Sequence, residues 1–232
     1  MNPIDASPVH QPEAVLFDLD GTLVDTFPDL ADALDFAVRD TGAGAVDRTR
    51  LRPLISRGTR EMIASVLPSH TDDERFDGAR RRFLARYSER IAVRSRLFPG
   101  IESVLRTLEE RGVRWGIVTN KHAWLTEPLL AELDLRRRAH CVVSGDSTAH
   151  PKPHPAPLIL ACDRLSVAPG AAVYVGDSRT DIESGRAAGV TTVSAGWGYL
   201  DPNDPPQRWE ADVDIETPDE LFDWVRGMFV ER

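Results

Sequence analysis

Cysteine is scarce in this chain. Its 232 residues include only two, Cys141 and Cys162, and both lie in apolar stretches (HCVVSG and LILACDRL). Such surroundings favour buried free thiols over a disulfide or a reactive site. The first eleven residues (MNPIDASPVHQ) also lack the basic start and the apolar run of a secretory signal peptide. We therefore expect a protein of the reducing cytoplasm.

Long apolar runs and an excess of positive charge are absent too. No stretch of the sequence approaches the roughly 18 apolar residues that span a bilayer. Acidic residues (37) outnumber basic ones (28), so the formal net charge is -9. Nucleic acids and anionic membrane surfaces repel such a chain, and we expect neither as a partner. An anionic substrate would need a local cluster of positive charge.

Lysine is the scarcest charged residue. Lys121 and Lys152 are the only lysines among the 28 basic residues, and the others are all arginines. The compact ammonium of lysine and the broad, planar guanidinium of arginine are not interchangeable in a confined site. Since this chain otherwise uses arginine for positive charge, the two lysines are candidates for a functional role.

The chain is rich in alternating strand and helix patterns. Short apolar runs with β character occur at residues 14–17, 115–118, 141–143, 172–175, 191–193 and 211–215. Predicted helices separate most of them, at residues 100–110, 124–133, 157–165, 178–188 and 218–229. Strands that are apolar on both faces and alternate with helices predict an α/β fold with a Rossmann-like, doubly wound parallel sheet.

The alternation is interrupted once, between Thr26 and Arg96. This segment contains no predicted strand, only helical stretches at about residues 28–40, 59–67 and 73–92. We interpret residues 27–96 as an all-helical insertion in a core that residues 1–26 and 97–232 form. A chain of 232 residues is long enough for one such core and a second small unit.

Two carboxylates directly follow the first predicted strand, in the string DLDGT at residues 18–22. Ligand sites in open α/β sheets lie at the carboxyl ends of the strands. Asp18 and Asp20 are therefore candidates for a nucleophile and a proton donor. The alternative is a simple turn, because Asp-Gly is common in turns and Asp often caps a helix.

Three further strings follow later strands. Thr119 and Asn120 end the second strand, where they would bind phosphoryl oxygens or merely cap a helix. Lys152 lies between the prolines of PKPHP, which would hold it at the start of a helix rather than in a solvated loop. Asp177 and Asp181 of GDSRTD would face a hard cation, although the same string also fits a capping box.

The four strings FDLDGTLVDT, VTNK, PKPHP and GDSRTD end four predicted strands in order. In sequence and spacing they resemble the four motifs of the haloacid dehalogenase superfamily phosphatases. The resemblance covers nearly the whole chain and includes a helical cap inserted between the first two motifs. It implies a phosphomonoester hydrolase whose cap closes over the site and selects the substrate. A non-catalytic relative that only binds would lack at least one charged motif residue, and none is missing.

Two groups within this superfamily are similar to the chain. The strings FDLDGTLVDT-FPDLADAL, LFPG, GIVTNK and VGDSRTDIESGRAAG resemble the phosphoglycolate phosphatases. The strings LRPLISRGTREMI and GWGYLDPNDPPQRWEADVDI resemble the N-acetylmuramic acid 6-phosphate phosphatases. The core strings rank phosphoglycolate slightly ahead as the expected substrate, with the muramic sugar phosphate as the alternative. Asp20 argues against a dehalogenase, which needs no acid for its leaving group, while a sugar phosphomutase stays open.

By this resemblance Asp18 is the nucleophile and forms an aspartyl-phosphate. Asp20 protonates the leaving oxygen and later accepts a proton from the hydrolytic water. Mg²⁺ would be held by Asp18, the backbone carbonyl of Asp20 and Asp177, with Asp181 as a ligand or an outer partner. The phosphoryl oxygens would be bound by the other motif residues, Thr119, Asn120 and Lys152.

Three residues outside the motifs are candidates for selecting a small phosphorylated metabolite. Arg57 in the insertion would bind a substrate carboxylate, and Trp197 or Tyr199 after the fifth strand would stack against a sugar ring. The alternatives are a solvated arginine and aromatic side chains that only cover an edge of the sheet. The sequence does not indicate an oligomeric state.

Overall fold

The computed structural model describes residues 11–67 and 72–229. The expectation that the chain lacks a signal peptide concerns residues 1–11, and residues 1–10 lie outside the described ones. Within the two described ranges, no helix has both the length and the apolar character that a membrane crossing requires.

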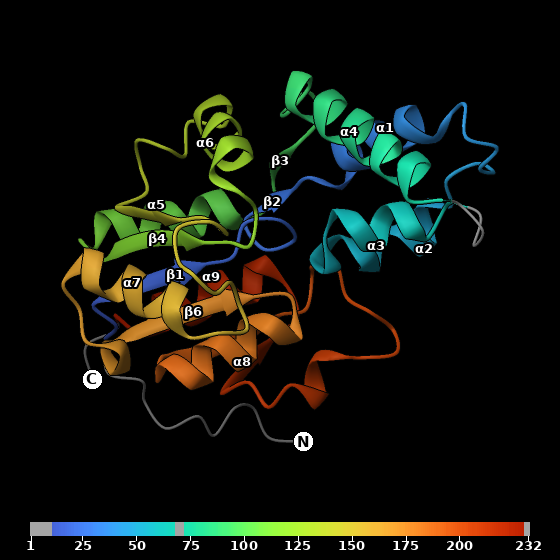
Figure 1. The fold of residues 1–232 in the computed structure, drawn as a ribbon. Coiled ribbons are helices and arrows are strands. Elements are labelled where there is room, and N and C mark those ends of the chain that lie inside the picture. The colour runs from blue at the N-terminus through green and yellow to red at the C-terminus, as the bar shows by residue number, and fades with distance from the viewer. Residues whose placement is uncertain (1–10, 68–71, 230–232) are drawn as a thin grey trace.

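A six-stranded sheet forms the centre of the molecule, in the order β5-β4-β1-β6-β7-β8 (Figure 1). The strands are β1 (Ala14–Phe17), β4 (Arg114–Val118), β5 (Cys141–Val143), β6 (Ala172–Gly176), β7 (Thr191–Ala195) and β8 (Val213–Ile215). All neighbouring strands are parallel. This confirms the predicted α/β fold, and no strand end differs from the prediction by more than two residues.

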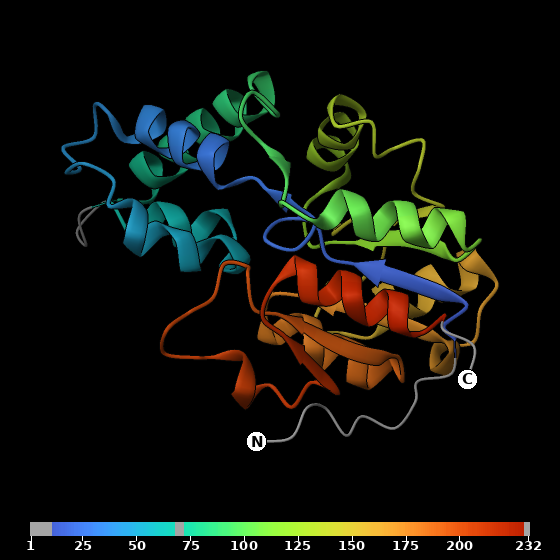
Figure 2. The ribbon, with the colours of Figure 1, turned by 180° about the vertical axis from the view of Figure 1, so that it is seen from behind.

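Helices cover both faces of the sheet. The helices of the core are α5 (Ile101–Glu110), α6 (Ala123–Glu132), α7 (Ala156–Leu165), α8 (Arg179–Ala188) and α9 (Pro218–Gly227), with short 3-10 turns η2 (Pro169–Ala171) and η3 (Pro206–Arg208). In Figure 1 α7 and α8 lie in front of the sheet, and Figure 2, the view from behind, shows α5 and α9 side by side on the opposite face. Because both faces are covered, strands such as β1 are buried along their whole length and had to be apolar throughout.

The helical insertion follows β2 (Val24–Asp25) and ends at β3 (Arg96–Leu97). It contains α1 (Phe27–Val38), α2 (Arg48–Leu51), the 3-10 helix η1 (Arg52–Arg57), α3 (Thr59–Ala64) and α4 (Asp73–Glu89). Strands β2 and β3 pair antiparallel, and the sequence does not predict them because strands of two residues carry no periodicity. The division into a core and a cap at residues 27 and 97 stays a prediction.

One buried carboxylate joins the two ends of the insertion. Asp29, near the start of α1, accepts hydrogen bonds from the backbone N–H groups of Arg94 (2.9 Å) and Ser95 (2.7 Å) and from the Ser95 hydroxyl (2.7 Å). A buried carboxylate with three donors is well compensated for its loss of hydration. These bonds hold the start of the insertion against its end and fix where α1 leaves the core.

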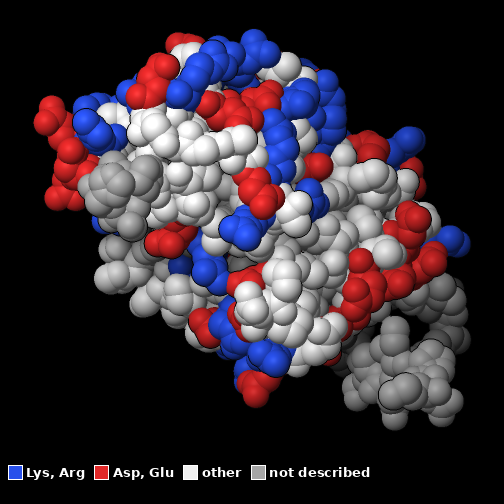
Figure 3. Space-filling view, turned by 90° about the vertical axis from the view of Figure 1, so that its right-hand side faces the viewer, with Lys and Arg blue, Asp and Glu red and all other residues white. Residues whose placement is uncertain are grey.

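The charged side chains of the surface are mixed. On the face shown in Figure 3, basic and acidic side chains are interspersed over the described residues instead of forming one basic area. In the insertion, for example, Arg48 pairs with both Asp32 and Asp35. The abundant arginines therefore serve partly as partners of surface carboxylates.

Candidate active site

The DLDGT turn after β1 packs directly against the GDSRTD segment after β6. Gly21 has a φ of +95°, and a Cβ at this position would lie 2.1 Å from an oxygen of Asp177. Only glycine fits such a backbone and such a close approach. The glycine therefore lets the turn bring Asp18 and Asp20 to the aspartates of the neighbouring strand.

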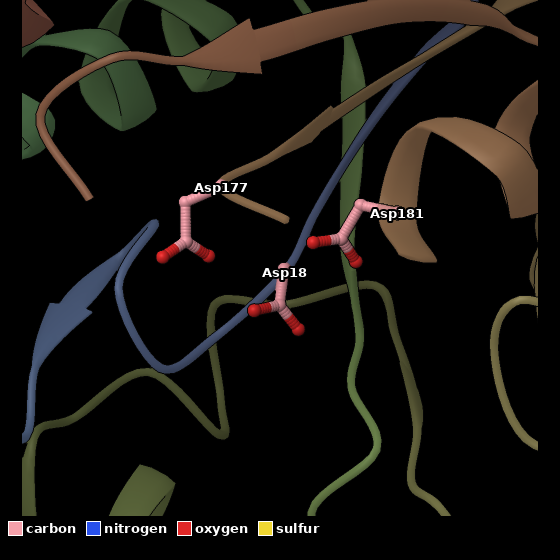
Figure 4. A group of neighbouring side chains, drawn as sticks. All are labelled: Asp18, Asp177 and Asp181. Carbon is pink, nitrogen blue, oxygen red and sulfur yellow. The ribbon is translucent and has the colours of Figure 1, made fainter. Parts of the chain in front are cut away.

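Three buried carboxylates face one another at this edge of the sheet. Asp18, Asp177 and Asp181 each offer an oxygen, and these oxygens lie within 4.8 Å of one another. Figure 4 shows the three side chains directed into a common space from β1, the end of β6 and the start of α8. The sequence prediction that these residues come together is borne out by this geometry, while their roles stay predictions.

Lys152 is the buried cation of this cluster. Its Nζ lies 2.7 Å from Asp18 Oδ1 and 2.6 Å from Asp181 Oδ1. The Tyr174 hydroxyl (2.8 Å) and the Val118 carbonyl (3.0 Å) complete its surroundings. Burial alone would lower the pKa of Lys152, but the two carboxylates outweigh it and raise the pKa. The ammonium is therefore charged, and it lies within 3.0 Å of four oxygen atoms while Lys152 also lines the cavity described below.

Asn120 holds the backbone of Lys152. Its side-chain nitrogen donates to the Lys152 carbonyl (3.0 Å), and its side-chain oxygen accepts from the Lys152 N–H (2.9 Å). We expected the Asn120 side chain to bind phosphoryl oxygens, but in the structure both of its polar atoms bond to the Lys152 backbone. Thr119 is buried beside it, lines the cavity and accepts a hydrogen bond from the Lys121 N–H (3.2 Å).

The acidic cluster carries more negative than positive charge. Burial raises the pKa of Asp18 to about 7, against the lowering effect of Lys152 and with smaller contributions from Asp181 and Asp20. Burial, together with the charges of Asp18 and Asp181, also raises the pKa of Asp177 well above its usual value. Lys152 contacts only two of the three carboxylates, and like charges this close in a low-dielectric site repel one another strongly. A further cation would relieve this repulsion.

The donor set fits a hard divalent cation. Oxygen atoms are the ligands that Mg²⁺ prefers, and Asp18, Asp177 and Asp181 each offer one to a common space. Asp177 is oriented by the Thr22 hydroxyl (3.2 Å) and the Tyr199 N–H (2.7 Å). A divalent cation is therefore compatible with the cluster.

Asp181 serves two purposes at once. One oxygen contacts Lys152, and the other accepts from the N–H (3.0 Å) and the hydroxyl (2.5 Å) of Ser178. The latter bonds form the capping box of α8, so this interpretation of the string is confirmed. These contacts orient the Asp181 carboxylate within the cluster, where it supports Lys152 as well as the start of α8.

The second lysine pairs with the second aspartate of the turn. Lys121 Nζ lies 2.9 and 3.1 Å from the two oxygens of Asp20, and the Thr26 hydroxyl donates to the same carboxylate (2.6 Å). Burial would lower the pKa of Lys121, but Asp20 outweighs it and raises the pKa. The two lysines of this chain thus lie on the two aspartates of one turn.

A cavity of about 440 Å³ opens above these residues. Its floor includes Asp18, Asp20 and both lysines, and its walls come from η1, α3 and α4 of the insertion and from α6 of the core. The walls combine apolar and basic side chains, namely Ile55, Met62, Phe83, Leu84, Trp124, Leu125, Arg57, Arg60 and Arg80. The insertion therefore supplies most of the surface that a ligand would meet beyond the acidic cluster.

The structure brings only one of the three expected selectivity residues to this cavity. Arg57 lines it, but the guanidinium forms an ion pair with Asp201 of the β7–β8 loop. Tyr199 is buried, and its hydroxyl donates to Asp25 (2.8 Å) and accepts from the Phe27 N–H (2.9 Å). These two hydrogen bonds hold the Tyr199 side chain at the base of the insertion.

Trp197 also lies away from the cavity lining. Its indole N–H donates to the Thr22 carbonyl at 3.0 Å, which braces the DLDGT turn. Neither this ring nor that of Tyr199 is among the residues that line the cavity. In this arrangement the two aromatic side chains support the site and do not present a stacking surface.

Several residues of the site were not singled out by the sequence analysis. Tyr174 bonds to Asp181 (2.9 Å) from within β6, where nothing in an apolar strand distinguishes it from a core residue. Tyr87 of α4 lines the cavity, and its position was visible only as one aromatic in an arginine-rich helix. Thr22 and Thr26, by contrast, lie within the FDLDGTLVDT string itself.

Comparison with known proteins identifies relatives over most of the chain. The family of haloacid dehalogenase-like hydrolases matches residues 15–195. A phosphoglycolate phosphatase of Xanthomonas campestris is 42% identical over 212 residues, which are 91% of this chain and 96% of that protein. An N-acetylmuramic acid 6-phosphate phosphatase of Pseudomonas aeruginosa is also 42% identical, over 91% of this chain and 93% of its own length.

A solved structure agrees with these relatives. The crystal structure of a protein from Haemophilus somnus, described as a predicted phosphoglycolate phosphatase, superposes with a TM-score of 0.82 at 27% identity. The match covers 92% of this chain and 98% of that one. Since the two kinds of phosphatase are equally similar to this chain, sequence identity does not indicate which of the two substrates it would use.

Proposed function

The chain belongs to the haloacid dehalogenase-like hydrolases and is a phosphoric monoester hydrolase, and we propose that it hydrolyses an anionic sugar phosphate through an aspartyl-phosphate at Asp18. The observation that carries the choice of substrate is the cavity of about 440 Å³ above the acidic cluster. The cofactor in this proposal is Mg²⁺.

The first step forms a bond between an Asp18 oxygen and phosphorus while the bond from phosphorus to the alcohol oxygen breaks. The Asp20 carboxyl gives its proton to that departing oxygen. Its contacts with Lys121 and Thr26 hold this carboxyl at the cavity floor beside Asp18. The product then leaves as an alcohol and not as an alkoxide.

The second step returns the enzyme to its starting state. Asp20 accepts a proton from water, and the water oxygen forms a bond to phosphorus while the bond to Asp18 breaks. Inorganic phosphate leaves, and Asp18 is again a free carboxylate. Release of phosphate, without a second phosphorylated sugar, distinguishes this reaction from that of a phosphomutase.

The acidic cluster and Lys152 would hold the phosphoryl group. Asp18, the backbone carbonyl of Asp20 and Asp177 would bind Mg²⁺, and Asp181 would orient Lys152. When bound, Mg²⁺ supplies positive charge that neutralises the phosphoryl oxygens. Lys152, fixed between Asp18 and Asp181, and the Thr119 hydroxyl would bind those oxygens directly.

The size of the cavity favours the larger of the two candidate substrates. A volume of about 440 Å³ falls within the range of about 300–1,000 Å³ that is typical of pockets for drug-sized ligands. Phosphoglycolate, a two-carbon acid, would leave most of this space to water. N-acetylmuramic acid 6-phosphate adds a ring, an acetamide and a lactyl carboxylate. The cavity thus reverses the order that the core strings of the sequence give, and phosphoglycolate becomes the second candidate.

The test is a side-by-side measurement of kcat/KM for the two phosphates with Mg²⁺, following released phosphate. We expect the muramic sugar phosphate to be at least about tenfold better, equivalent to about 1.4 kcal/mol of transition-state binding. Chelation of the metal should abolish turnover of both. A preference for phosphoglycolate would refute the choice of substrate, and full activity after chelation would refute the cofactor.

A further inference from the structure

One face of α4 lines the cavity from its floor to its mouth. Arg80, Phe83, Leu84 and Tyr87 all contact this space, and their spacing of three, four and seven residues places them on one side of the helix. Seven residues of α-helix rise by about 10 Å. The helix thus offers a ligand two polar groups, Tyr87 and Arg80, with an apolar stretch between them.

The inner end of this face carries a buried hydroxyl. Tyr87 is 1% exposed, and its ring centroid lies 4.7 Å from Lys121 Nζ, which contacts Asp20. Within residues 11–67 and 72–229, the Tyr87 hydroxyl donates its proton to no acceptor. Burial raises the pKa of Tyr87 to about 12, only partly opposed by Lys121, so the hydroxyl keeps its proton. A buried donor without a partner is costly, and a ligand acceptor would satisfy it.

The outer end carries an available positive charge. Of the three arginines in the cavity walls, Arg57 pairs with Asp201, and Arg60 lies over the ring of Phe76 at 5.1 Å. Arg80 is exposed and forms no ion pair with any other described residue. Side chains of a helix point toward its N-terminus, which directs Arg80 away from Tyr87 and further out along the wall.

We infer that Tyr87 and Arg80 form the subsite for the part of the substrate that carries no phosphate. Tyr87 donates a hydrogen bond to a substituent near the phosphate, and Arg80 binds a carboxylate at the far end. Trp124 of α6, half exposed, lines the same cavity and packs against the body of the ligand. The inference rests on the proposed function and makes it more specific, because a two-carbon acid is too short to reach both ends.

Binding to an inactive enzyme tests this subsite. In an Asp18→Asn background with Mg²⁺, calorimetry would give the Kd of N-acetylmuramic acid 6-phosphate and of N-acetylglucosamine 6-phosphate, which lacks the lactyl carboxylate. Arg80→Gln should weaken binding of the first at least about tenfold, the usual loss for a charged hydrogen bond, and change the second less than about twofold. Arg81→Gln, an exposed neighbour outside the cavity lining, is the matched control and should change neither.

Tyr87→Phe keeps the ring and removes only the hydroxyl. It should weaken binding of both sugars by a similar factor of about three to ten, because the group it contacts is common to them. An Arg80→Gln variant that loses both ligands equally, or neither, would overturn the inference. If Arg80→Gln weakens binding of the carboxylated sugar alone, the subsite is supported. If the wild-type enzyme also releases no phosphate from any phosphomonoester, the proposed catalysis is refuted while the subsite stands.

Discussion

The Nζ atom of Lys152 lies 2.7 Å from Asp18 Oδ1, although 134 residues separate the two in the chain. The same ammonium reaches Asp181 at 2.6 Å, so one buried positive charge serves two carboxylates. Asp177 shares the space and forms no ion pair with any of the residues that the structure describes. This excess of negative charge connects the fold with the proposed chemistry, because a bound divalent cation would offset it before an anionic phosphoryl group enters.

Asp18→Asn should abolish turnover and leave the fold intact, since the amide keeps the shape of the carboxylate but is not a nucleophile. We expect kcat to fall by about 10⁴-fold or more. Single-turnover kinetics with mass spectrometry of the trapped phosphoenzyme would measure it, with the exposed Asp163→Asn as a control. A variant that retains more than about a hundredth of the wild-type kcat would rule out Asp18 as the obligatory nucleophile.

Lys152→Arg should be nearly as damaging as Lys152→Ala, with a loss of about 100-fold in kcat/KM. The ammonium is surrounded by four oxygens within 3.0 Å, and a planar guanidinium does not fit such a space. Lys121→Arg is the comparison, and we expect a milder effect because Lys121 contacts a single carboxylate. Wild-type kcat/KM in Lys152→Arg would refute the argument from side-chain shape.

Arg57→Ala should not discriminate between carboxylated and uncharged substrates, because the guanidinium is already paired with Asp201. The side chain is 53% exposed, so the pair contributes only about 0–1 kcal/mol to stability. We expect Asp201→Ala to give the same small change in kcat/KM as Arg57→Ala. A loss confined to carboxylated substrates in Arg57→Ala, but not in Asp201→Ala, would restore the role that the sequence analysis gave Arg57.

Cys141 and Cys162 should resist alkylation in the folded protein. Both are buried, and burial raises the pKa of each thiol from 9.0 to about 11, so both stay protonated at pH 8. Iodoacetamide labelling followed by mass spectrometry should find both thiols unmodified, and both modified after denaturation. Free, unreactive thiols would agree with the reducing compartment that the sequence predicts. Rapid labelling of the native protein would contradict the burial.

Much of the fold was accessible from the sequence because its signals are local. The six strands are short apolar runs, and parallel strands covered on both faces need such residues wherever they occur. The motif strings also indicated the site residues, since a carboxylate or a rare lysine at the end of an apolar strand is unusual. The pairing of β2 with β3 could not be predicted from the sequence, because each strand is only two residues long.

The sequence by itself thus determined which strands end in reactive side chains, and therefore that Asp18, Asp177 and Lys152 share one edge of the sheet. Only the tertiary structure decided what the insertion contributes. It paired Arg57 with Asp201, 144 residues away, and left Arg80 at the cavity wall instead. The physical reason is that the positions of the strands along the chain follow from local patterns, whereas the partner of a long, flexible side chain depends on where another segment is placed in space.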